Sequence, residues 1–322
     1  MKAIRIHEFG GPEVLTYEDI PEPAPKPNEA VVKLDASGVN FIDIYQRVGI
    51  YKLPLPTTLG LEGAGTVTAV GSDAKDVKVG DRVAWTSVQG AYAEFSAVPV
   101  DRLVAVPPAV TLKQGAAMML QGMTAHYLAH STYPLKAGET CLVHAGAGGV
   151  GLLLTQVAKL RGARVITTVS TAEKAALSRE AGADHVVLYT IQDFEAEVKQ
   201  FTGGKGVPVV YDSVGLSTFE KSLNCLSPRG MLVLFGQSSG VVPPIDAQLL
   251  SQKGSLFFTR PTLVHYIASR EELQQRARDL FDWIGGGKLR LRTEFEFPLK
   301  DAAEAQKALA GRKTTGKVLL VP

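Results

Sequence analysis

The sequence predicts an α/β protein in which a β-rich domain precedes a doubly wound parallel sheet. Up to about residue 105, short strand-like runs are broken by Gly, Pro and Asp. From about residue 120, apolar runs of strand length alternate with helical patterns, which is typical of βαβ units. The chain has 322 residues and is 45% hydrophobic, which is enough to bury the cores of one large or two ordinary domains.

The first part of the chain has five strand-like runs. They are AVVKLDASG, GAGTVTAVGSD, DRVAW, AYAEFSAVP and DRLVAVP. The proline-rich segment 21–29 lies between strand-like runs, so we expect an ordered loop there.

The middle of the chain has six strand candidates with helical patterns among them. The strands are expected at 140–145, 164–169, 185–189, 207–215, 231–236 and 255–260. The helices are expected at 149–162, 171–183, 192–204 and 217–230. Six strands with helical crossovers favour a doubly wound dinucleotide fold.

The last part of the chain is expected to return to the first domain. One amphipathic helix follows Ser269, a plausible N-cap with Glu272 three residues later. The closing TTGKVLLVP predicts a strand of the first sheet. The expected division is therefore a first domain over 1–120, a nucleotide-binding domain over 121–260, and a return over 261–322.

Charge and composition exclude several classes of function. Lys and Arg total 34 against 32 for Asp and Glu, without a block of like charge, so nucleic acid or an acidic membrane is not an expected partner. No segment approaches the roughly 20 apolar residues of a membrane span. Charges at Lys2, Arg5 and Glu8 interrupt any apolar signal core, so a cytoplasmic protein with a small-molecule partner is expected. Cys141 and Cys225 lack metal-type spacing and fit a reducing compartment.

The stretch HAGAGGVG at 144–151 has GxGxxG spacing between a strand and a helix. We expect Gly146 to permit the turn, Gly148 to let the backbone approach a pyrophosphate, and Gly151 to allow close helix–strand packing. A purely structural turn is the alternative.

The end of the second strand of this unit bears on the cofactor. NAD-selective sites usually place Asp or Glu there, whereas this chain has Ser170 and Thr171, with Lys174 one turn later. Hydroxyls and an ammonium suit a 2′-phosphate, so NADPH is favoured over NADH. The alternative is that Ser170 or Thr171 only caps the next helix, with Glu173 in its first turn.

Several stretches together resemble the medium-chain dehydrogenase/reductase superfamily. They are KLDASGVNFIDIYQRVG, LPTTLGLEGAGTVTAVGSD, VKVGDRV and AGAGGVG. Within the superfamily the chain is similar to the zinc-free quinone oxidoreductases over essentially its whole length. The resemblance implies a GroES-like β-rich catalytic domain, a Rossmann-type NADPH-binding domain, and a homodimer that pairs through the edge strand at SLFFTR.

The ligand positions of the zinc-dependent relatives are changed in this chain. Their Cys-x-x-Asp corresponds to Asn40–Asp43, their Gly-His-Glu to Gly60-Leu61-Glu62, and the third ligand position falls near Gln121. Leu61 has no lone pair, and catalytic zinc needs three N, S or O ligands. The four-cysteine lobe is also missing. No metal is therefore expected.

The histidines do not suggest a metal or a base. His126 and His130 are spaced i, i+4 but lack a third ligand, so ordinary packing is expected. His144 is expected to be held by a backbone hydrogen bond at the end of its strand rather than to act as a base.

Without a Lewis acid, the substrate must be an easily reduced acceptor. A quinone or an α,β-unsaturated ketone meets this condition, which favours NADPH-dependent quinone reduction, with an enone, enoyl or alkenal reductase as the alternative. A non-catalytic NADPH-binding protein, structural or RNA-associated, is a further alternative that the likeness to zeta-crystallin allows.

The resemblance also implies roles for individual residues. At the nicotinamide end it places Asn40, Asp43, Tyr45 and Thr124. Elsewhere around the cofactor it places Gly146, Gly148, Gly149, Val150, Ser170, Lys174, Tyr189, Phe235, Gln237, Ser238 and Arg312. Tyr45 is the first candidate for a hydrogen-bond or proton donor and Asn40 the second. The alternative is that Tyr45 only packs on the nicotinamide, since water can protonate the product.

Overall fold

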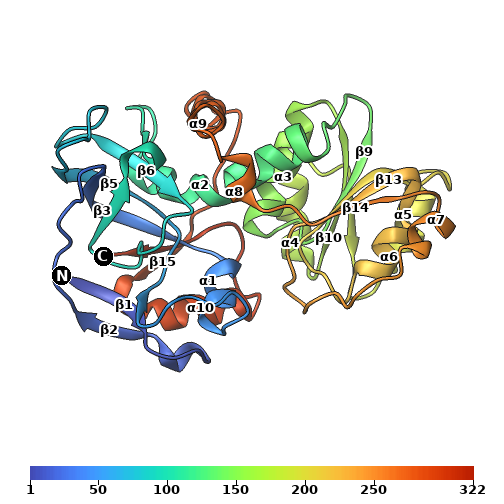
Figure 1. Cartoon of the computed structure of the whole chain (residues 1–322). Coiled ribbons are helices and arrows are strands. Elements are labelled where there is room, and N and C mark those ends of the chain that lie inside the picture. The colour runs from blue at the N-terminus through green and yellow to red at the C-terminus, as the bar shows by residue number, and fades with distance from the viewer. The chain divides into compact units, whose positions relative to one another are not determined.

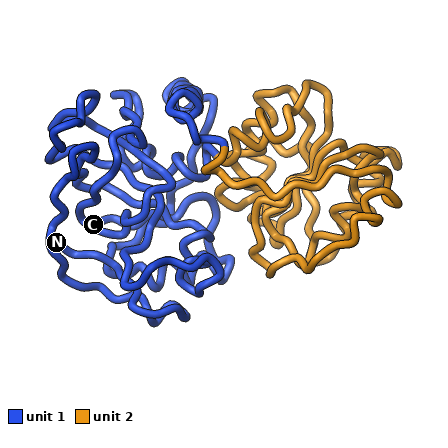
Figure 2. The backbone as a smooth tube through the Cα atoms, in the orientation of Figure 1, with its two compact units in different colours: residues 1–123, 266–322 blue, residues 124–265 orange.

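A computed structural model describes all residues from Met1 to Pro322. The chain forms two compact units, which Figure 2 colours separately: unit 1 consists of residues 1–123 and 266–322, and unit 2 of residues 124–265. None of the helices combines the length and apolar character that crossing a membrane requires.

Unit 2 is built on a parallel sheet of six strands (Figure 1). Its strands are β9 (Thr140–Val143), β10 (Arg164–Val169), β11 (His185–Leu188), β12 (Val207–Asp212), β13 (Leu226–Leu234) and β14 (Phe257–Thr259). They are arranged in the order β11-β10-β9-β12-β13-β14. The direction of winding reverses between β9 and β12, and ligands of such sheets bind beyond the carboxyl ends of the strands at this point.

Helices cover both faces of this sheet, so the predicted doubly wound fold is confirmed. The helices of unit 2 are α3 (Gly149–Leu160), α4 (Ala172–Glu180), α5 (Phe194–Phe201), α6 (Phe219–Asn224) and α7 (Gln248–Gln252). Phe194 of α5 and Phe219 of α6 share a core with Val187, whereas Ala175 of α4 packs with Val186. Since successive strand residues face opposite sides, α4 and the pair α5 and α6 lie on different faces.

The expected helix over 217–230 was too long. Helix α6 ends at Asn224 and strand β13 begins at Leu226. Pro228 disfavours the helical conformation at the residue before it, and Arg229 adopts a left-handed φ of 61°. The pairing of β12 with β13 shifts register between Val207 and Val209, which accommodates this irregular start.

Unit 1 contains one sheet of seven strands and one of three. The larger has β15 (Phe295–Pro298), β16 (Val318–Val321), β3 (Glu29–Val39), β5 (Glu62–Val70), β6 (Arg82–Thr86) and β8 (Val104–Ala105) in that order, with β7 (Phe95–Pro99) also on β3. The smaller has the order β2 (Thr16–Asp19), β1 (Lys2–Ile6), β4 (Thr57–Thr58). The segment 21–29 lies between β2 and β3 and has no regular structure until β3 begins.

Five helices lie in this unit or at its boundaries. They are α1 (Phe41–Arg47), α2 (Leu112–Tyr127), which continues as a π-turn over Leu128–Thr132, α8 (Leu263–Tyr266), α9 (Arg270–Gly285) and α10 (Ala302–Ala310), with 3₁₀ turns at Pro12–Val14, Val100–Arg102 and Leu299–Asp301. The predicted cap of α9 is confirmed, because the hydroxyl of Ser269 accepts a hydrogen bond from the backbone N–H of Glu272 at 3.2 Å.

Three strand ends meet at one place in unit 1. Strand β16 runs antiparallel to β3, with Val318 opposite Val39. Strand β5 also pairs with β3, with Gly63 opposite Ser37. The residues just outside or at these ends, Asn40, Glu62 and Lys317, are therefore brought together from distant parts of the sequence.

Candidate active site

Asn40 and Asp43 fix the start of helix α1. The carboxyl Oδ2 of Asp43 accepts hydrogen bonds from the backbone N–H of Asn40 at 2.8 Å and from the hydroxyl of Tyr92 at 2.9 Å. This is the carboxyl half of a capping box, which ties the first turn of a helix to the residue before it. Asp43 is completely buried, so its side chain supports α1 from the interior.

The environment of Asp43 changes its ionisation. Burial raises the pKa of Asp43 from its ordinary value to about 7, although the two hydrogen bonds and the charge of Lys317 lower it. Its Oδ1 atom has no hydrogen-bond partner. Burial also raises the pKa of Tyr92 well above its ordinary value, so that side chain stays a donor at neutral pH.

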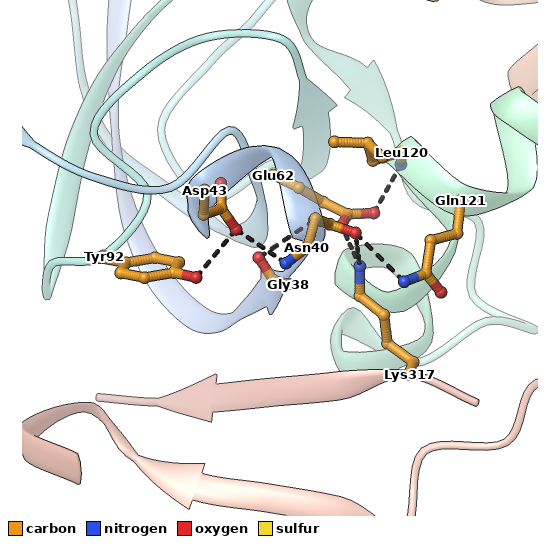
Figure 3. Close-up of polar contacts among 8 residues, drawn as sticks. All are labelled: Gly38, Asn40, Asp43, Glu62, Tyr92, Leu120, Gln121 and Lys317. Atoms are coloured by element: carbon orange, nitrogen blue, oxygen red, sulfur yellow. Dashed lines mark hydrogen bonds and ion pairs between the residues drawn. The ribbon is translucent and has the colours of Figure 1, made fainter. Parts of the chain in front are cut away.

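The amide of Asn40 is completely used inside the protein (Figure 3). Its Nδ2 donates to Glu62 Oε2 at 2.9 Å and to the carbonyl of Gly38 at 3.3 Å. Its Oδ1 accepts from Lys317 Nζ at 2.9 Å and from Gln121 Nε2 at 3.2 Å. An amide side chain has two donor and two acceptor positions, so none is left here for a substrate.

Glu62 and Lys317 form a buried ion pair next to this amide. Their side chains are 0% and 2% exposed, so each charge depends on the other for compensation. The second oxygen of Glu62 accepts from the backbone N–H of Leu120 at 2.6 Å. Gly38 makes room for the pair, because a Cβ at that position would overlap both charged groups.

The positions that carry zinc ligands in the zinc-dependent relatives hold a different arrangement. The amides of Asn40 and Gln121 bond to each other, Leu61 is a half-buried apolar residue, and Glu62 is paired with Lys317. No group of three or more His, Cys, Asp or Glu side chains is placed to hold a metal ion. His126 and His130 stack with their ring centroids 4.2 Å apart, and Nδ1 of His130 donates to the carbonyl of His126 at 3.0 Å.

Tyr45 lies on α1 within a group of aromatic side chains. Its ring centroid is 6.1 Å from that of Phe41 and 5.8 Å from that of Tyr51, which meets it edge-on. Tyr45 is half-buried, and Tyr51 is 40% exposed. The group presents an aromatic surface of the kind on which a flat ring can pack.

In unit 2 the glycine loop joins β9 to α3, with Gly148 as the N-cap. Ala145 takes the left-handed conformation in this turn, with a φ of 54°. Gly146 leaves the space that the turn needs, because a Cβ there would lie 2.5 Å from the Cβ of Thr167. A Cβ at Gly151 would overlap the carbonyl of Ala145, whereas one at Gly148 would meet only that carbonyl, at 3.2 Å. The loop thus leaves Gly148 open beside the unpaired N–H groups of Gly149 and Val150.

His144 makes the expected backbone hydrogen bond, from its N–H to the carbonyl of Tyr211 at 3.1 Å, and its ring is held by side chains as well. Its Nε2 lies 3.0 Å from Ser222 Oγ, and its Nδ1 lies 2.9 Å from Thr168 Oγ1. Ser222 donates to the buried carboxylate of Asp212 at 3.0 Å, so it accepts from His144 and leaves Nδ1 to accept from Thr168. Burial lowers the pKa of His144, against the opposing charge of Asp212. The neutral ring therefore connects the end of β9 to β10 and to helix α6.

The end of β10 combines a helix cap with other polar side chains. Thr171 caps α4, because its hydroxyl accepts from the backbone N–H of Lys174 at 3.3 Å, so the capping interpretation is confirmed for Thr171. Ser170 lies between this cap and the strand, and its carbonyl accepts from Thr190 Oγ1 at 3.1 Å. Tyr189 follows the neighbouring strand β11 and is 40% exposed. No carboxylate stands at the end of β10.

The other predicted cofactor residues divide between the two units. Phe235, Gln237 and Ser238 follow β13 at the carboxyl edge of the sheet in unit 2, where the N–H of Phe235 donates to the carbonyl of Asp212 at 2.8 Å. Thr124 is a buried residue of α2 at the beginning of unit 2. Arg312 lies in unit 1, in the turn after α10, with a φ of 57°.

Sequence reasoning assigned no role to Glu62, Tyr92 or Lys317, and named Gln121 only as a former ligand position. The signal for Lys317 was a charged residue directly before the apolar run VLLV. Its partners Asn40 and Glu62 lie 277 and 255 residues away along the chain, so no local pattern could have paired them.

Comparison with known proteins finds relatives over the whole length of the chain. Residues 26–108 match the family model for the alcohol dehydrogenase GroES-like domain, and residues 149–284 match that for zinc-binding dehydrogenases. The chain is 48% identical over 323 residues to a quinone oxidoreductase of Pseudomonas aeruginosa, with 100% of this chain and 99% of the relative covered. It is 43% identical over 326 residues to a 2-haloacrylate reductase of a Burkholderia species, with 98% of each covered.

A solved structure agrees equally well. The structure of Escherichia coli quinone oxidoreductase in complex with NADPH matches with a TM-score of 0.98 and 45% identity, and both chains are covered completely. Identity at this level over the full length shows that the chain belongs to the quinone oxidoreductase family of the medium-chain dehydrogenases and reductases.

Proposed function

We propose that this chain is an NADPH-dependent quinone reductase that works without a metal. The observation that carries the proposal is the end of β10, where Ser170, Lys174 and nearby Tyr189 stand in place of a carboxylate. Full-length similarity to quinone oxidoreductases, one of them solved with NADPH, supports the same cofactor and acceptor.

The residues of unit 2 fit the phosphates of this cofactor. Gly148 has no side chain, so a pyrophosphate can approach the N-terminus of α3 at Gly149 and Val150. Gly146 keeps the loop close to β10. We assign Ser170, Lys174 and Tyr189 to the 2′-phosphate and its ribose, because hydroxyl and ammonium groups form charge-assisted bonds with a phosphate.

We assign Phe235, Gln237 and Ser238 to the cofactor as well, because they follow β13 at the carboxyl edge of the sheet. Thr124 and Arg312 are assigned by the family resemblance alone. Asp43 is completely buried, so we assign it to the support of α1 rather than to the nicotinamide.

The reaction balances without a metal. NADPH supplies a hydride to the quinone when it is bound, and one proton from solvent or a side chain completes the hydroquinone. We assign Tyr45 as the hydrogen-bond donor to the acceptor, because it lies in the aromatic group with Phe41 and Tyr51. We assign Asn40 a positioning role, because its amide is completely used by Gly38, Glu62, Lys317 and Gln121.

Reduction of an activated alkene is a second candidate function. The similarity to a 2-haloacrylate reductase over 98% of both chains favours it specifically. Both reactions transfer a hydride to an acceptor that delocalises the incoming charge, so the same site can serve either.

The deciding experiment is a comparison of NADPH and NADH oxidation with a panel of quinones, enones and 2-chloroacrylate. We expect rapid NADPH oxidation with 1,4-benzoquinone and slower oxidation of NADH. Turnover with enones or 2-chloroacrylate but not with quinones would make the protein an alkene reductase. NADPH binding without oxidation by any acceptor would support a structural or RNA-associated protein.

We also propose a homodimer and a cytoplasmic location. Strand β14 is an edge of its sheet, and Phe257 on it is 58% exposed, so this edge needs a cover. Phe257→Lys is expected to give a monomer in sedimentation velocity, where the original chain gives a dimer. If the original chain is also a monomer in sedimentation velocity, the proposed homodimer is wrong. The cytoplasmic location is supported by the free, buried Cys141 and Cys225.

A further inference from the structure

Gln121 carries a buried polar atom that the protein itself does not satisfy. The residue is 8% exposed, and its Nε2 donates to Asn40 at 3.2 Å. Its Oε1 has no hydrogen-bond partner, and Figure 3 shows this atom directed away from the other members of the cluster. A buried acceptor without a donor is costly, and native proteins rarely leave one unless something else binds to it.

The direction of this amide is forced by the charges beside it. Lys317 can only donate, so Asn40 must turn its Oδ1 toward the ammonium. Glu62 accepts from the other end of the same amide, which must therefore be Nδ2. Because Oδ1 of Asn40 can only accept, Gln121 must present its Nε2 and direct its Oε1 elsewhere. Reversing either amide would put two donors or two acceptors face to face.

The same ion pair also fixes the backbone that carries Gln121. Glu62 uses its second oxygen to accept from the N–H of Leu120, the residue directly before Gln121 on α2, at 2.6 Å. The pair is buried, and the absence of a side chain at Gly38 leaves the space that it occupies. Two independent connections thus run from the Lys317–Glu62 pair to Gln121.

We propose that Gln121 is a ligand-binding residue whose Oε1 accepts a hydrogen bond from a ligand hydroxyl, and that the Lys317–Glu62 pair is the positioning group that sets this polarity. The inference rests on the proposed function, which offers two sources of such a hydroxyl. One is the hydroquinone product, which gains O–H groups that the quinone lacks. The other is a ribose hydroxyl of the cofactor.

If the hydroquinone is the source, the contact exists only after reduction. It then stabilises the reduced ligand relative to the quinone, which is the differential binding that favours a reaction. If the ribose is the source, the contact is present from the moment NADPH binds and sets only the affinity for the cofactor.

The test compares two ligands that differ in their donors. Hydroquinone has two hydroxyl donors, and 1,4-dimethoxybenzene has the same ring with none. Their Kd values are measured by calorimetry on the full chain saturated with NADP⁺, and the ratio of the two is the readout. Gln121→Met keeps the length of the side chain and removes its polarity. Gln275→Met makes the same substitution on the exposed surface of α9 and is the matched control.

For the hydroquinone source we expect Gln121→Met to weaken hydroquinone binding about tenfold and leave the ether unchanged. For the ribose source we expect the Kd of NADP⁺ itself to rise about tenfold, with the ratio of the two aromatic ligands unchanged. If neither the ratio nor the NADP⁺ affinity changes, Gln121 does not bind a ligand hydroxyl and the proposal is wrong.

The positioning role is tested by Glu62→Gln combined with Lys317→Met, which removes both charges together and leaves neither unpaired. The control is the same double substitution at the exposed pair Glu304 and Lys307. If the substitution merely loosens the site, the affinities for hydroquinone and 1,4-dimethoxybenzene fall equally. If it removes the polarity and the hydroquinone is the source, the preference for hydroquinone over the ether falls. If the ribose is the source, the preference for NADP⁺ over its analogue with a 2′-deoxyribose on the nicotinamide falls. Unchanged selectivity in this variant would remove the ion pair from the proposal.

Failure of the proposed function has a separate signature. It would show as the absence of NADPH oxidation by the original chain with any quinone, and the ratio of ligand affinities can still be measured in that case. If the original chain reduces quinones normally and Gln121→Met changes neither the ratio of the two Kd values nor the Kd for NADP⁺, this inference is wrong and the proposed function stands.

Discussion

Lys317 is a single charge whose environment makes it costly to disturb. Its ammonium is 2% exposed and is paired with a carboxylate that is completely buried. Removing one member of such a pair leaves the other charged, buried and without compensation, and that residual charge dominates the cost.

We therefore expect Lys317→Met to lower the free energy of unfolding by about 3–5 kcal/mol. Adding Glu62→Gln to it is expected to recover more than half of that loss, because no charge then remains buried. Urea unfolding at pH 7 measures both. A double variant as unstable as the single one would show that packing around the lysine stem, and not the unpaired carboxylate, determines the cost.

Tyr45 either donates a hydrogen bond to the acceptor or only packs against the nicotinamide, and the two roles predict different effects of Tyr45→Phe on kcat. We expect Tyr45→Phe to lower kcat with 1,4-benzoquinone about tenfold through loss of one hydrogen bond, with little change in the affinity for NADPH. Tyr17→Phe, at an exposed tyrosine of β2, is the control. If kcat is unchanged in Tyr45→Phe, Tyr45 only packs against the ligand, and water protonates the product.

Single residues also show where sequence reasoning reached its limit. Asn40 and Gln121 were found because they replace known ligand types at recognisable positions. Their hydrogen bonds were not predictable, because the partners Glu62 and Lys317 come from strands that pair only in the folded sheet. Asn40 was therefore expected as a donor, although the fold consumes its amide.

At the scale of elements, local patterns predicted most of unit 2. The strands at β9 and β10 and the helix between them follow from apolar runs and a glycine loop that need no distant contacts. The prediction failed at α6, where Pro228 and the pairing of β13 with β12 ended the helix early. It did not foresee the left-handed conformation of Ala145 in the glycine loop.

Alanine substitutions at Gly148 and Gly151 of the glycine loop distinguish an effect on ligand binding from an effect on stability. We expect Gly148→Ala to change the midpoint of thermal unfolding less than Gly151→Ala does, because its φ of −75° suits alanine and its Cβ would lie 3.2 Å from the carbonyl oxygen of Ala145, against 2.2 Å for a Cβ at Gly151. The same methyl group occupies the path of the phosphate, so the Kd for NADPH is expected to rise about tenfold or more by fluorescence titration.

Gly151→Ala is the counterpart on the same loop. Its Cβ overlaps the carbonyl of Ala145, so a loss of about 1–3 kcal/mol of stability is expected from overpacking. We thus assign Gly148 to NADPH binding and Gly151 to packing of the loop. If both variants lose NADPH affinity equally and neither loses stability, this assignment is wrong.

At the scale of the whole molecule, each unit carries its own group of residues. Unit 2 carries the glycine loop and the residues that we propose for the 2′-phosphate, and unit 1 carries Tyr45 and the buried polar cluster. The return of the chain to unit 1 is essential to that cluster, because β16 delivers Lys317. The unit boundaries fall at 123/124 and 265/266, where composition and pattern had suggested 120/121 and 260/261.

The two units also contain buried groups that respond to pH in opposite directions. In unit 2 the folded protein lowers the pKa of His144. The unfolded chain therefore takes up a proton first, and this contribution to stability is lost as the pH falls below about 6.5. In unit 1 the pKa of Asp43 is raised to about 7. The folded chain then keeps a proton that the unfolded chain releases, and stability is lost as the pH rises from about 4 to about 7.

Asp43→Asn isolates the second effect. The amide oxygen can still accept from Asn40 and Tyr92, but the side chain cannot ionise beside Glu62 and Lys317. We expect the stability of this variant relative to the original chain to be higher at pH 8 than at pH 5, as measured by urea unfolding at both values. Asp76→Asn, at an exposed position, is expected to show no such difference. If the relative stability of Asp43→Asn is instead the same at pH 5 and pH 8, the carboxyl is ionised in the folded protein throughout this range, and the hydrogen bonds and the ammonium of Lys317 then outweigh the burial that raises its pKa.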